Sequence, residues 1–426
     1  MYYLKLIKSY KQKILSKFAK IFLTQSYRLD LFYRLINSKN NLKENLSSYR
    51  NIYIDVSVIA KHNSKTGVQR VVKEIIREFI KDKDISYKVR FIASSKRTGY
   101  KEVTLIDIEN LVFSNTPINY FKEVELSKYD IFLGLDFCPT ILPCHFFTLL
   151  SWRFKGTAFA WVIHDILPLQ HPNWFTENTQ NNFLPWLNMV LLLADINFCV
   201  SNTVKNSILD LCREINFEPN LTKIRLGANF SVPLKKYSNS QKQIQLIADS
   251  YVLIVGTLEP RKGHMDIIRV FNYLWLKKLT SINLVIVGKY GWKSESLISE
   301  IEYNQFYNQK LFWVKDLEDE GLDKYYTGCL GVIIPSYAEG YGLPIAEALF
   351  YNKSVLARDI SVFRENFSYS NYITFFAANN EHITNSIMSW LNGLNKPIYT
   401  SFKEQNYIMD TWEVSKDDIL RKIVKE

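Results

Sequence analysis

The segment PSYAEGYGLPIAEAL, residues 335–349, has the residue pattern with the clearest chemistry in this chain. Glu339 and Glu347 stand eight positions apart, with Gly340 and Gly342 between them. An apolar run precedes the segment, and the glycines permit a tight turn and a close approach of the backbone to a ligand. The pattern predicts a strand, a glycine-rich turn and a helix N-terminus, which together are typical of a phosphate site.

The two glutamates suit the hydroxyl groups of a ligand. Glu339 on the turn can reach hydroxyls near the phosphate, and Glu347, about one turn into the helix, can accept both hydroxyls of a ribose. For an isolated pair of glutamates, a solvated turn residue and a residue that complements the helix dipole are the commoner explanation. The strand and the glycines favour the functional interpretation here.

A second segment, VGTLEPRKGH at residues 255–264, also follows an apolar run and precedes a helical pattern. Arg261 and Lys262 stand side by side at the helix entrance, where two cations oppose the helix dipole and favour a bound anion. A diphosphate would satisfy both, since arginine binds phosphate with a bidentate fork and lysine as a point charge. The alternative is an exposed basic turn.

Two weaker candidates lie in the first half of the chain. Gly67 opens a helical pattern in HNSKTGVQRVV, where it can face phosphates, and His164 ends an apolar run in WVIHDILPLQHP, where it can bond a sugar hydroxyl. An ordinary helix start and a structural histidine are the alternatives. Both residues stay as candidates because ligands bind at strand ends in open α/β sheets.

Two runs of alternating strand and helix must position these residues, one from residue 51 and one from about residue 250. The polar stretch LKKYSNSQKQ separates them. This rhythm predicts an α/β protein with two doubly wound, Rossmann-like parallel-sheet domains. The expected parts are a helical arm at 1–47, a first domain at 48–233, a linker at 234–244, a second domain at 245–410 and a C-terminal helix at 411–426 that crosses back to the first domain.

Most of the net charge lies in the arm. Residues 1–50 contain eleven Lys or Arg and two acids, and so hold +9 of a total of +11 over 426 residues. Residues 1–24 have nine apolar side chains on one face and lysines on the other, which predicts a basic amphipathic helix. Such a helix suits an anionic membrane surface. The alternative is that its apolar face packs on the body of the protein and its lysines are simply solvated. A nucleic-acid partner is not expected, because its binding would favour basic residues spread over a folded face.

Several classes of site are not supported. Five cysteines without CxxC spacing and six scattered histidines indicate neither a disulfide framework nor a structural zinc, and favour a reducing compartment. No signal peptide is visible, and no acidic pair for a divalent metal stands out at a strand end. The most apolar window, residues 183–200, is interrupted by Pro185, Asn188, Asp195 and Asn197, so a buried helix followed by a strand is expected there.

Taken together, these motifs resemble the retaining, nucleotide-sugar-dependent glycosyltransferases of family four, which have the two-domain GT-B fold. PSYAEGYGLPIAEAL resembles that family's E-x7-E signature, VGTLEPRKG resembles its phosphate loop, and ARDISVFRE resembles the stretch that follows. TGVQRV, VIHDILPLQHP and FCVSN resemble a bacterial subgroup that builds O-antigen or capsular polysaccharide, often with mannose. The resemblance extends over about residues 50–415.

The resemblance implies roles for individual residues. The first domain would be the acceptor side, the second would bind the nucleotide sugar, and the base would lie near 313–316. Many members have an arginine where this chain has Thr257, and Arg261 would then supply that charge. Catalytic roles would fall to His164, Arg261, Lys262 and Glu339, and donor contacts to Gly67, Gly256, Arg261, Lys262, Glu339, Gly340, Tyr341, Gly342, Leu343 and Glu347.

The expected function is transfer of a hexose, best guessed as mannose from GDP-mannose, to a growing glycan or lipid-linked acceptor with retention of anomeric configuration. The resemblance implies that the departing diphosphate oxygen takes the acceptor proton, so no protein nucleophile is expected. Neither a metal nor another cofactor is expected, since no acidic pair for a divalent metal stands out. The expected location is the cytoplasm, on the inner face of a bacterial inner membrane through residues 1–24. A GT-B sugar-nucleotide epimerase and an inactive sugar-nucleotide-binding scaffold remain as alternatives.

Overall fold

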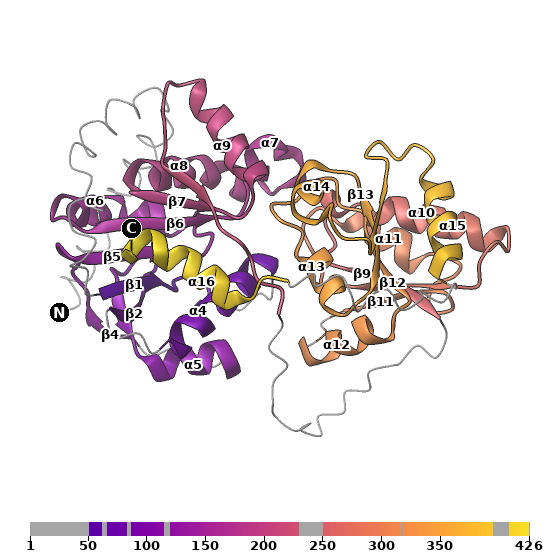
Figure 1. Ribbon diagram of the computed structural model, residues 1–426, viewed down its shortest axis with the longest axis horizontal. Helices are drawn as coiled ribbons and strands as arrows, with labels where there is room; N and C mark the ends of the chain where they lie inside the picture. Colours follow the sequence, from indigo (N-terminus) through magenta and orange to yellow (C-terminus); the bar gives the residue numbers. More distant parts are fainter. Residues whose placement is uncertain are drawn as a thin grey trace. The chain divides into compact units, whose positions relative to one another are not determined.

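The computed structural model describes residues 51–61, 66–82, 87–114, 120–229, 250–315, 317, 319–394 and 409–425. These residues form two compact units (Figure 1). The first unit holds the described residues up to Pro172, Glu177–Gly227 and the residues from Thr411 onward, and the second holds Asn173–Thr176 and the described part of Ala228–Asp410. The predicted arm at 1–47 and the predicted linker at 234–244 lie outside the described residues.

The first unit is built on a sheet of eight strands in the order β4-β3-β2-β1-β5-β6-β7-β8. The strands from β2 to β8 in that order are parallel neighbours. Every residue of β5, β6 and β7 is buried, since a parallel sheet is covered on both faces and its strands are continuous apolar runs. The strands are β1 (Asn51–Asp55), β2 (Lys88–Ala93), β3 (Lys101–Val103), β4 (Tyr120–Glu123), β5 (Asp130–Gly134), β6 (Ala158–Ile163), β7 (Ile196–Cys199) and β8 (Leu221–Lys223).

Three short strands at or next to the edges of this sheet are not predicted by the sequence pattern. β3 and β4 extend the sheet beyond β2 in antiparallel pairs, and β8 closes the other edge. Each has only three or four residues with polar members such as Lys101 and Thr222. Short, half-exposed edge strands lack the apolar run that identifies the central strands.

The helices of the first unit connect these strands. The apolar window at 183–200 forms the end of α8 and then β7, which confirms the expectation of a buried helix followed by a strand. Pro185 lies inside α8. The helices are α4 (Gly67–Lys81), α5 (Leu105–Ser114), α6 (Phe146–Phe154), α7 (Leu167–Gln170), α8 (Glu177–Leu193), α9 (Asn202–Arg213) and α16 (Trp412–Leu420).

The C-terminal helix α16 packs against α4 within the first unit (Figure 1). The Trp412 side chain is fully buried, and Lys416 Nζ donates to Asp82 Oδ2 at 2.5 Å. The Gly227 amide donates to Ser415 Oγ at 2.9 Å. A Cβ atom on Gly227 would lie 2.3 Å from the Trp412 nitrogen, so only glycine permits this close approach.

The second unit is built on six parallel strands in the order β11-β10-β9-β12-β13-β14. Renumbered along the chain, this order is 3-2-1-4-5-6, that of the Rossmann fold. The chain therefore leaves β9 toward one edge of the sheet and later returns to β12 on its other side. The strands are β9 (Tyr251–Val255), β10 (Asn283–Val287), β11 (Leu311–Val314), β12 (Gly331–Ile334), β13 (Ser354–Arg358) and β14 (Ile373–Phe376).

Two hydrophobic clusters cover the two faces of this second sheet. Alternate residues of β9 belong to different clusters, with Val252 and Ile254 in one and Tyr251 and Leu253 in the other. This alternation follows from the pleat of a strand, which points successive side chains to opposite faces. The helices are α10 (His264–Leu276), α11 (Glu295–Glu302), α12 (Asp319–Gly328), α13 (Leu343–Phe350), α14 (Ser361–Phe367) and α15 (Ile383–Leu394).

Candidate functional site

The strongest sequence candidates meet at the carboxyl ends of β9 and β12. These two strands are neighbours, and the connections that follow them run to opposite sides of the sheet. Such a point is a topological switch point, where open α/β sheets bind ligands. The loop after β9 leads through the turn Pro260–Lys262 into α10, and the loop after β12 leads through Glu339 into α13.

Arg261, Lys262 and Glu339 form one cluster. Arg261 Nη1 donates to Glu339 Oε2 at 2.8 Å, and Lys262 Nζ donates to Glu339 Oε1 at 2.5 Å. Arg261 Nη2 also pairs with Glu259 Oε1 at 2.8 Å. Two cations therefore face two carboxylates, and the three clustered side chains are only 9–16% exposed. From the sequence, a bound anion was expected to balance the two cations. In the structure, the carboxylates of Glu259 and Glu339 supply that negative charge.

Glu259 is the member of this cluster that the sequence interpretation missed. Its side chain is 2% exposed, and its position just before the turn Pro260–Lys262 places it beside Arg261. A carboxylate two positions from an arginine is a weak signal in a sequence, because such pairs are common on solvated turns. Burial gives the pair its significance, and burial is read only from the structure.

Close approach of the two loops depends on Gly263. Its φ of 68° is in the left-handed region, and a Cβ atom there would lie 2.2 Å from the Pro335 carbonyl oxygen. The loops are joined further by the Tyr337 amide, which donates to the Arg261 carbonyl at 2.8 Å. At the start of the first loop, a Cβ atom on Gly256 would lie 3.7 Å from Lys262 Cε. The Lys262 side chain thus passes over Gly256 toward Glu339.

The charge state of Glu339 follows from its neighbours. Burial alone would raise its pKa, but the positive charges of Arg261 and Lys262, with their hydrogen bonds, lower the pKa of Glu339 to about 2. The carboxylate is therefore ionised at neutral pH and bonded to both cations. An anionic ligand that binds these cations has to compete with it.

Arg358 supports the Glu339 loop from the end of β13. Its side chain is fully buried and donates to the Pro335 carbonyl at 2.8 Å and to Asp266 Oδ2 at 2.8 Å. The guanidinium also lies 4.0 Å from the centroid of the Tyr337 ring. Asp266 belongs to the first turn of α10, so Arg358 links the start of that helix to the loop after β12. Arg358 stands in the segment ARDISVFRE, whose sequence pattern alone indicates no role for it.

Glu347 lies apart from the cation cluster, within α13. Its side chain is 3% exposed, and the Tyr326 hydroxyl donates to its Oε2 at 2.5 Å. The helix begins after Gly342, whose φ is 111°, with Leu343 and a proline in its first turn. Tyr341, just before this glycine, packs edge-on against Phe367. Gly340, on the same loop, is buried.

The region expected to hold the base is aromatic. Tyr290 follows β10 and Trp313 lies within β11, and the centroids of their rings are 4.8 Å apart in an edge-to-face arrangement. Lys315 Nζ lies 3.9 Å from the centroid of the Trp313 ring and donates to Glu302 at 3.0 Å. Position 316, the last of the expected segment, lies outside the described residues.

His164 and Gly67 belong to the first unit. His164 follows β6, and its Nε2 lies 2.8 Å from the Leu135 carbonyl. Because a carbonyl only accepts, Nε2 is the protonated nitrogen, and burial lowers the pKa of His164 to about 4. The ring is therefore neutral, with Nδ1 as an acceptor. Gly67 is exposed at the start of α4, which Thr66 caps by accepting from the Gln69 amide at 3.3 Å.

The described part of the chain has neither a cluster of metal-ligating side chains nor a helix that could span a membrane. There, no group of three or more His, Cys, Asp or Glu side chains is arranged to hold a metal ion. Likewise, none of the helices in the ranges given above has both the length and the apolar character needed to cross a membrane.

Comparison with protein families and sequences gives consistent matches. Residues 238–407 match the family model described as glycosyl transferases group 1. The chain is 31% identical over 386 residues to the serotype-specific mannosyltransferase WbdA of Escherichia coli, a match that covers 88% of this chain and 46% of WbdA. It is 27% identical over 279 residues to the O-antigen chain mannosyltransferase RfbU of Salmonella typhimurium, covering 63% of this chain and 71% of RfbU. The chain thus spans about half the length of WbdA.

Solved structures share the architecture at low sequence identity. Alr3699/HepE of Anabaena, crystallised with UDP and glucose, superposes with a TM-score of 0.54 at 15% identity, covering 88% of this chain and 96% of that one. Sucrose-phosphate synthase of Thermosynechococcus elongatus gives a TM-score of 0.52 at 15% identity, covering 88% and 94%. These likenesses concern the fold.

Proposed function

Because the chain belongs to the group 1 glycosyl transferases and has their two-domain GT-B fold, we propose that it transfers mannose from a nucleoside-diphosphate sugar to a glycan acceptor. The observation that carries this proposal is the cluster of Arg261, Lys262 and Glu339 at the switch point between β9 and β12. The choice of mannose is supported by relatives that are named mannosyltransferases.

In the proposed mechanism, the donor diphosphate takes the place of Glu339 on the two cations. Arg261 binds phosphate oxygens as a fork, and Lys262 as a point charge. The displaced carboxylate of Glu339 then accepts hydrogen bonds from hydroxyls of the transferred sugar. Negative charge on the leaving diphosphate grows in the transition state, and preorganised cations at that point lower the barrier.

The proposed reaction proceeds with retention at the anomeric carbon. The bond from that carbon to the diphosphate oxygen breaks, and a bond to the acceptor oxygen forms on the same face. The acceptor proton passes to the departing diphosphate oxygen, so no protein nucleophile is needed. Glu347 in α13 is proposed to hold the ribose, and the aromatic pair Tyr290 and Trp313 lies where the base is expected. Catalysis is then positioning and charge stabilisation.

We propose that the two cations do the work of a metal ion at the diphosphate, so that no cofactor is required. The acceptor is proposed to be a growing surface polysaccharide or a lipid-linked glycan. Residues 1–24, whose basic amphipathic pattern suits an anionic bilayer, are proposed to keep the enzyme on the inner face of the bacterial inner membrane. There a lipid-linked acceptor would be presented to the first unit.

The test has two stages. Thermal unfolding with GDP-, UDP-, ADP- and dTDP-sugars identifies the donor, because a ligand at 100 times its Kd stabilises the folded state by about 2.7 kcal/mol. The donor so identified is then incubated with fluorescent glycosides of mannose, glucose, galactose and N-acetylglucosamine, with and without EDTA. Transfer in both conditions is the expected result.

Other outcomes separate the alternatives. Conversion of the donor sugar without any acceptor would favour an epimerase. Binding of the nucleotide sugar without turnover, with every acceptor tested, would favour an inactive scaffold. The sequence feature in favour of this alternative is Thr257, which stands where many family members have an arginine.

A further inference from the structure

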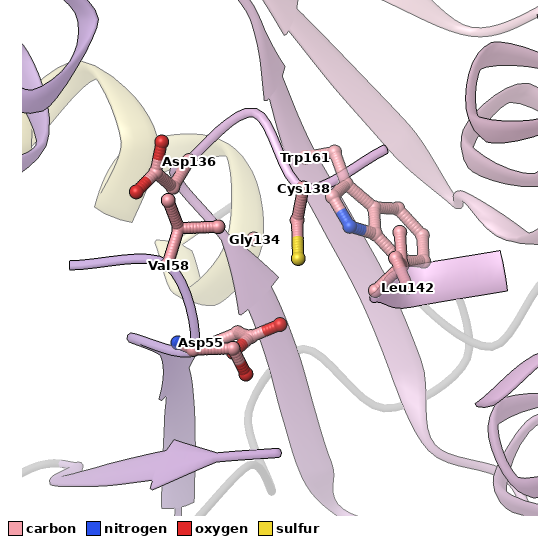
Figure 2. Close-up of a pocket in the computed structure, with 8 residues that line it drawn as sticks. Asp55, Val58, Gly134, Asp136, Cys138, Leu142 and Trp161 are labelled. Carbon is pink, nitrogen blue, oxygen red and sulfur yellow. The ribbon is translucent and has the colours of Figure 1, made fainter. Parts of the chain in front are cut away.

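The strand ends of the two sheets are packed differently. In the first unit, the pocket between Asp55 and Asp136 is packed against Trp161 and leaves no room for a water molecule (Figure 2). In the second unit, Arg358 at the last position of β13 places a fully buried guanidinium at the same edge of the sheet as the cation cluster. A buried charge is unfavourable unless hydrogen-bond partners surround it. The partners of Arg358 therefore indicate what this charge does.

Arg358 donates to three separate segments of the second unit. Its Nε donates to the Pro335 carbonyl at 2.8 Å, at the start of the loop that carries Glu339. Its Nη2 donates to Asp266 Oδ2 at 2.8 Å, in the first turn of α10. Its Nη1 donates to the Ala378 carbonyl at 2.7 Å, after β14. One planar group thus fixes the loop after β12 and the start of α10 relative to each other.

Tyr337 connects this arrangement to the cation cluster. The Arg358 guanidinium lies over the Tyr337 ring, 4.0 Å from its centroid, and the Tyr337 hydroxyl donates to Asp266 Oδ2 at 2.5 Å. The Tyr337 amide donates to the Arg261 carbonyl at 2.8 Å. Tyr337 also precedes Glu339 by two positions in the same loop. A residue that Arg358 holds through its ring therefore holds the backbone of Arg261 and leads directly to Glu339.

The proposed reaction is sensitive to where these two loops lie. Arg261, on the loop after β9, would bind the diphosphate, and Glu339, on the loop after β12, would bind hydroxyls of the sugar. The bond that breaks lies between these two groups of the donor. Charge stabilisation at such a bond depends on groups that are already in place before the reaction begins. A contact that fixes the spacing of the two loops therefore affects the rate of the chemical step.

We infer that Arg358 is a positioning residue for the proposed sugar transfer and that it acts through Tyr337. The inference rests on the proposed function, because it names the residue that fixes the two loops of that site. Arg358 is fully buried and its four hydrogen bonds go to protein groups, so it does not contact the donor itself. A lysine would keep the charge but lacks the planar fork that reaches three segments at once.

The test measures sugar transfer by Arg358→Lys and Tyr337→Ala, with Arg364→Lys as the matched control. Arg364 in α14 makes contacts of the same kind, an ion pair with Asp359 at 2.7 Å and a ring contact with Phe375 at 4.0 Å, but it is half-exposed and lies outside both loops. Rates are divided by the active fraction, taken from the stoichiometry of nucleoside diphosphate binding in calorimetry. The first two variants should each lower kcat about tenfold, since a misplacement of about 1 Å can cost up to a hundredfold. The control should match the wild type.

Combined variants separate positioning from a general loss of stability. Arg358→Lys should add little to Tyr337→Ala, because the two residues act in series. In a Glu339→Gln background, measured with excess enzyme, Arg358→Lys should reduce kcat by a smaller factor than in the wild type, because one of the side chains that it positions is already changed. Independent effects would instead multiply. Tyr337→Phe, which keeps the ring over the guanidinium, should lose less than Tyr337→Ala.

Wild-type kcat in folded Arg358→Lys and Tyr337→Ala would overturn the inference, as would factors that multiply in the combined variants. Where Arg358→Lys does not fold, Tyr337→Ala supplies the test by itself, because the Tyr337 side chain is 37% exposed and is not part of the core. A wild-type protein that binds no nucleotide sugar and consumes none refutes the proposed function as well. An active wild type with unaffected variants overturns only the role of Arg358.

Discussion

The contact of Glu339 with Arg261 and Lys262 makes a specific prediction about nucleotide affinity. In the proposed mechanism, a nucleoside diphosphate without its sugar has to displace the Glu339 carboxylate, which accepts from Arg261 at 2.8 Å and from Lys262 at 2.5 Å. The displaced Glu339 gains no sugar hydroxyls in return. In Glu339→Gln the amide is a weaker competitor, so the free nucleoside diphosphate should bind more tightly although the variant transfers sugar poorly.

The magnitude follows from the contacts that are lost. A hydrogen bond to a charged group contributes about 1.5–3 kcal/mol. The neutral amide still has one carbonyl oxygen that accepts from one of the cations. The net relief is therefore about one such bond, or about 1.5 kcal/mol, which corresponds to roughly tenfold tighter binding. The intact nucleotide sugar should show no such gain in affinity, because in the proposed mechanism its hydroxyls donate hydrogen bonds to the displaced Glu339 of the wild-type protein.

The assay is isothermal calorimetry with the nucleoside diphosphate and with its sugar conjugate. Glu295→Gln serves as the matched control, since it removes the same charge from an exposed position on α11. Weaker binding of the free nucleoside diphosphate to Glu339→Gln would refute the idea that carboxylate and diphosphate compete for the cations. Equal gains for both ligands would refute the proposed contact of Glu339 with the sugar.

Four further predictions concern the same site and the arm. Arg261→Ala or Lys262→Ala should each lower kcat/KM by about ten- to a hundredfold, and the double variant should fold yet show almost no turnover in the transfer assay. Glu347→Gln should weaken binding of the free nucleoside diphosphate in calorimetry, and unchanged affinity would contradict its assignment to the ribose. Arg261 and Lys262 lower the pKa of Glu339 from 4.5 to about 2 against the effect of burial, so its stabilising contribution is present above pH 4.5 and is lost as the pH falls toward 2. In urea titrations the stability difference between wild type and Glu339→Gln should thus shrink by about 2 kcal/mol between pH 5 and pH 3. Deleting residues 1–47 should leave nucleotide binding intact and abolish salt-sensitive sedimentation with anionic vesicles, and loss of nucleotide binding would instead place the arm in the folded core.

Much of the second unit was predictable because its chemistry is local in sequence. Strands buried on both faces are continuous apolar runs, and the glycines at 263 and 342 mark turns that need a positive φ. Arg261 and Lys262 stand next to each other, and Glu339 lies in a recognisable motif. Each of these signals falls within about fifteen residues, the distance over which periodicity and turn chemistry are informative.

The residues that were missed depend on contacts between distant positions. Arg358 becomes important because its guanidinium reaches Pro335 and Asp266, and Glu259 because it is buried beside Arg261. A sequence gives residue types and spacing, whereas burial and orphaned polar atoms are properties of the packed chain.

Apart from the short segment Asn173–Thr176, the chain crosses between its two units at two points, and these lie side by side. The Ala228 amide donates to the Asp410 carbonyl at 3.0 Å, one residue after Gly227 and one residue before Thr411. In genetic terms, the segment Ala228–Asp410 is therefore an insertion into the first unit, and the two ends of the insertion are adjacent. Recombination at these two junctions would exchange the proposed nucleotide-sugar half between relatives, while the first unit would keep its own sheet and the packing of α16 against α4. Under the proposed function, donor and acceptor preference could then evolve separately in the two units. A chimaera made at both Gly227 and Thr411 should fold, whereas one with a single junction should not.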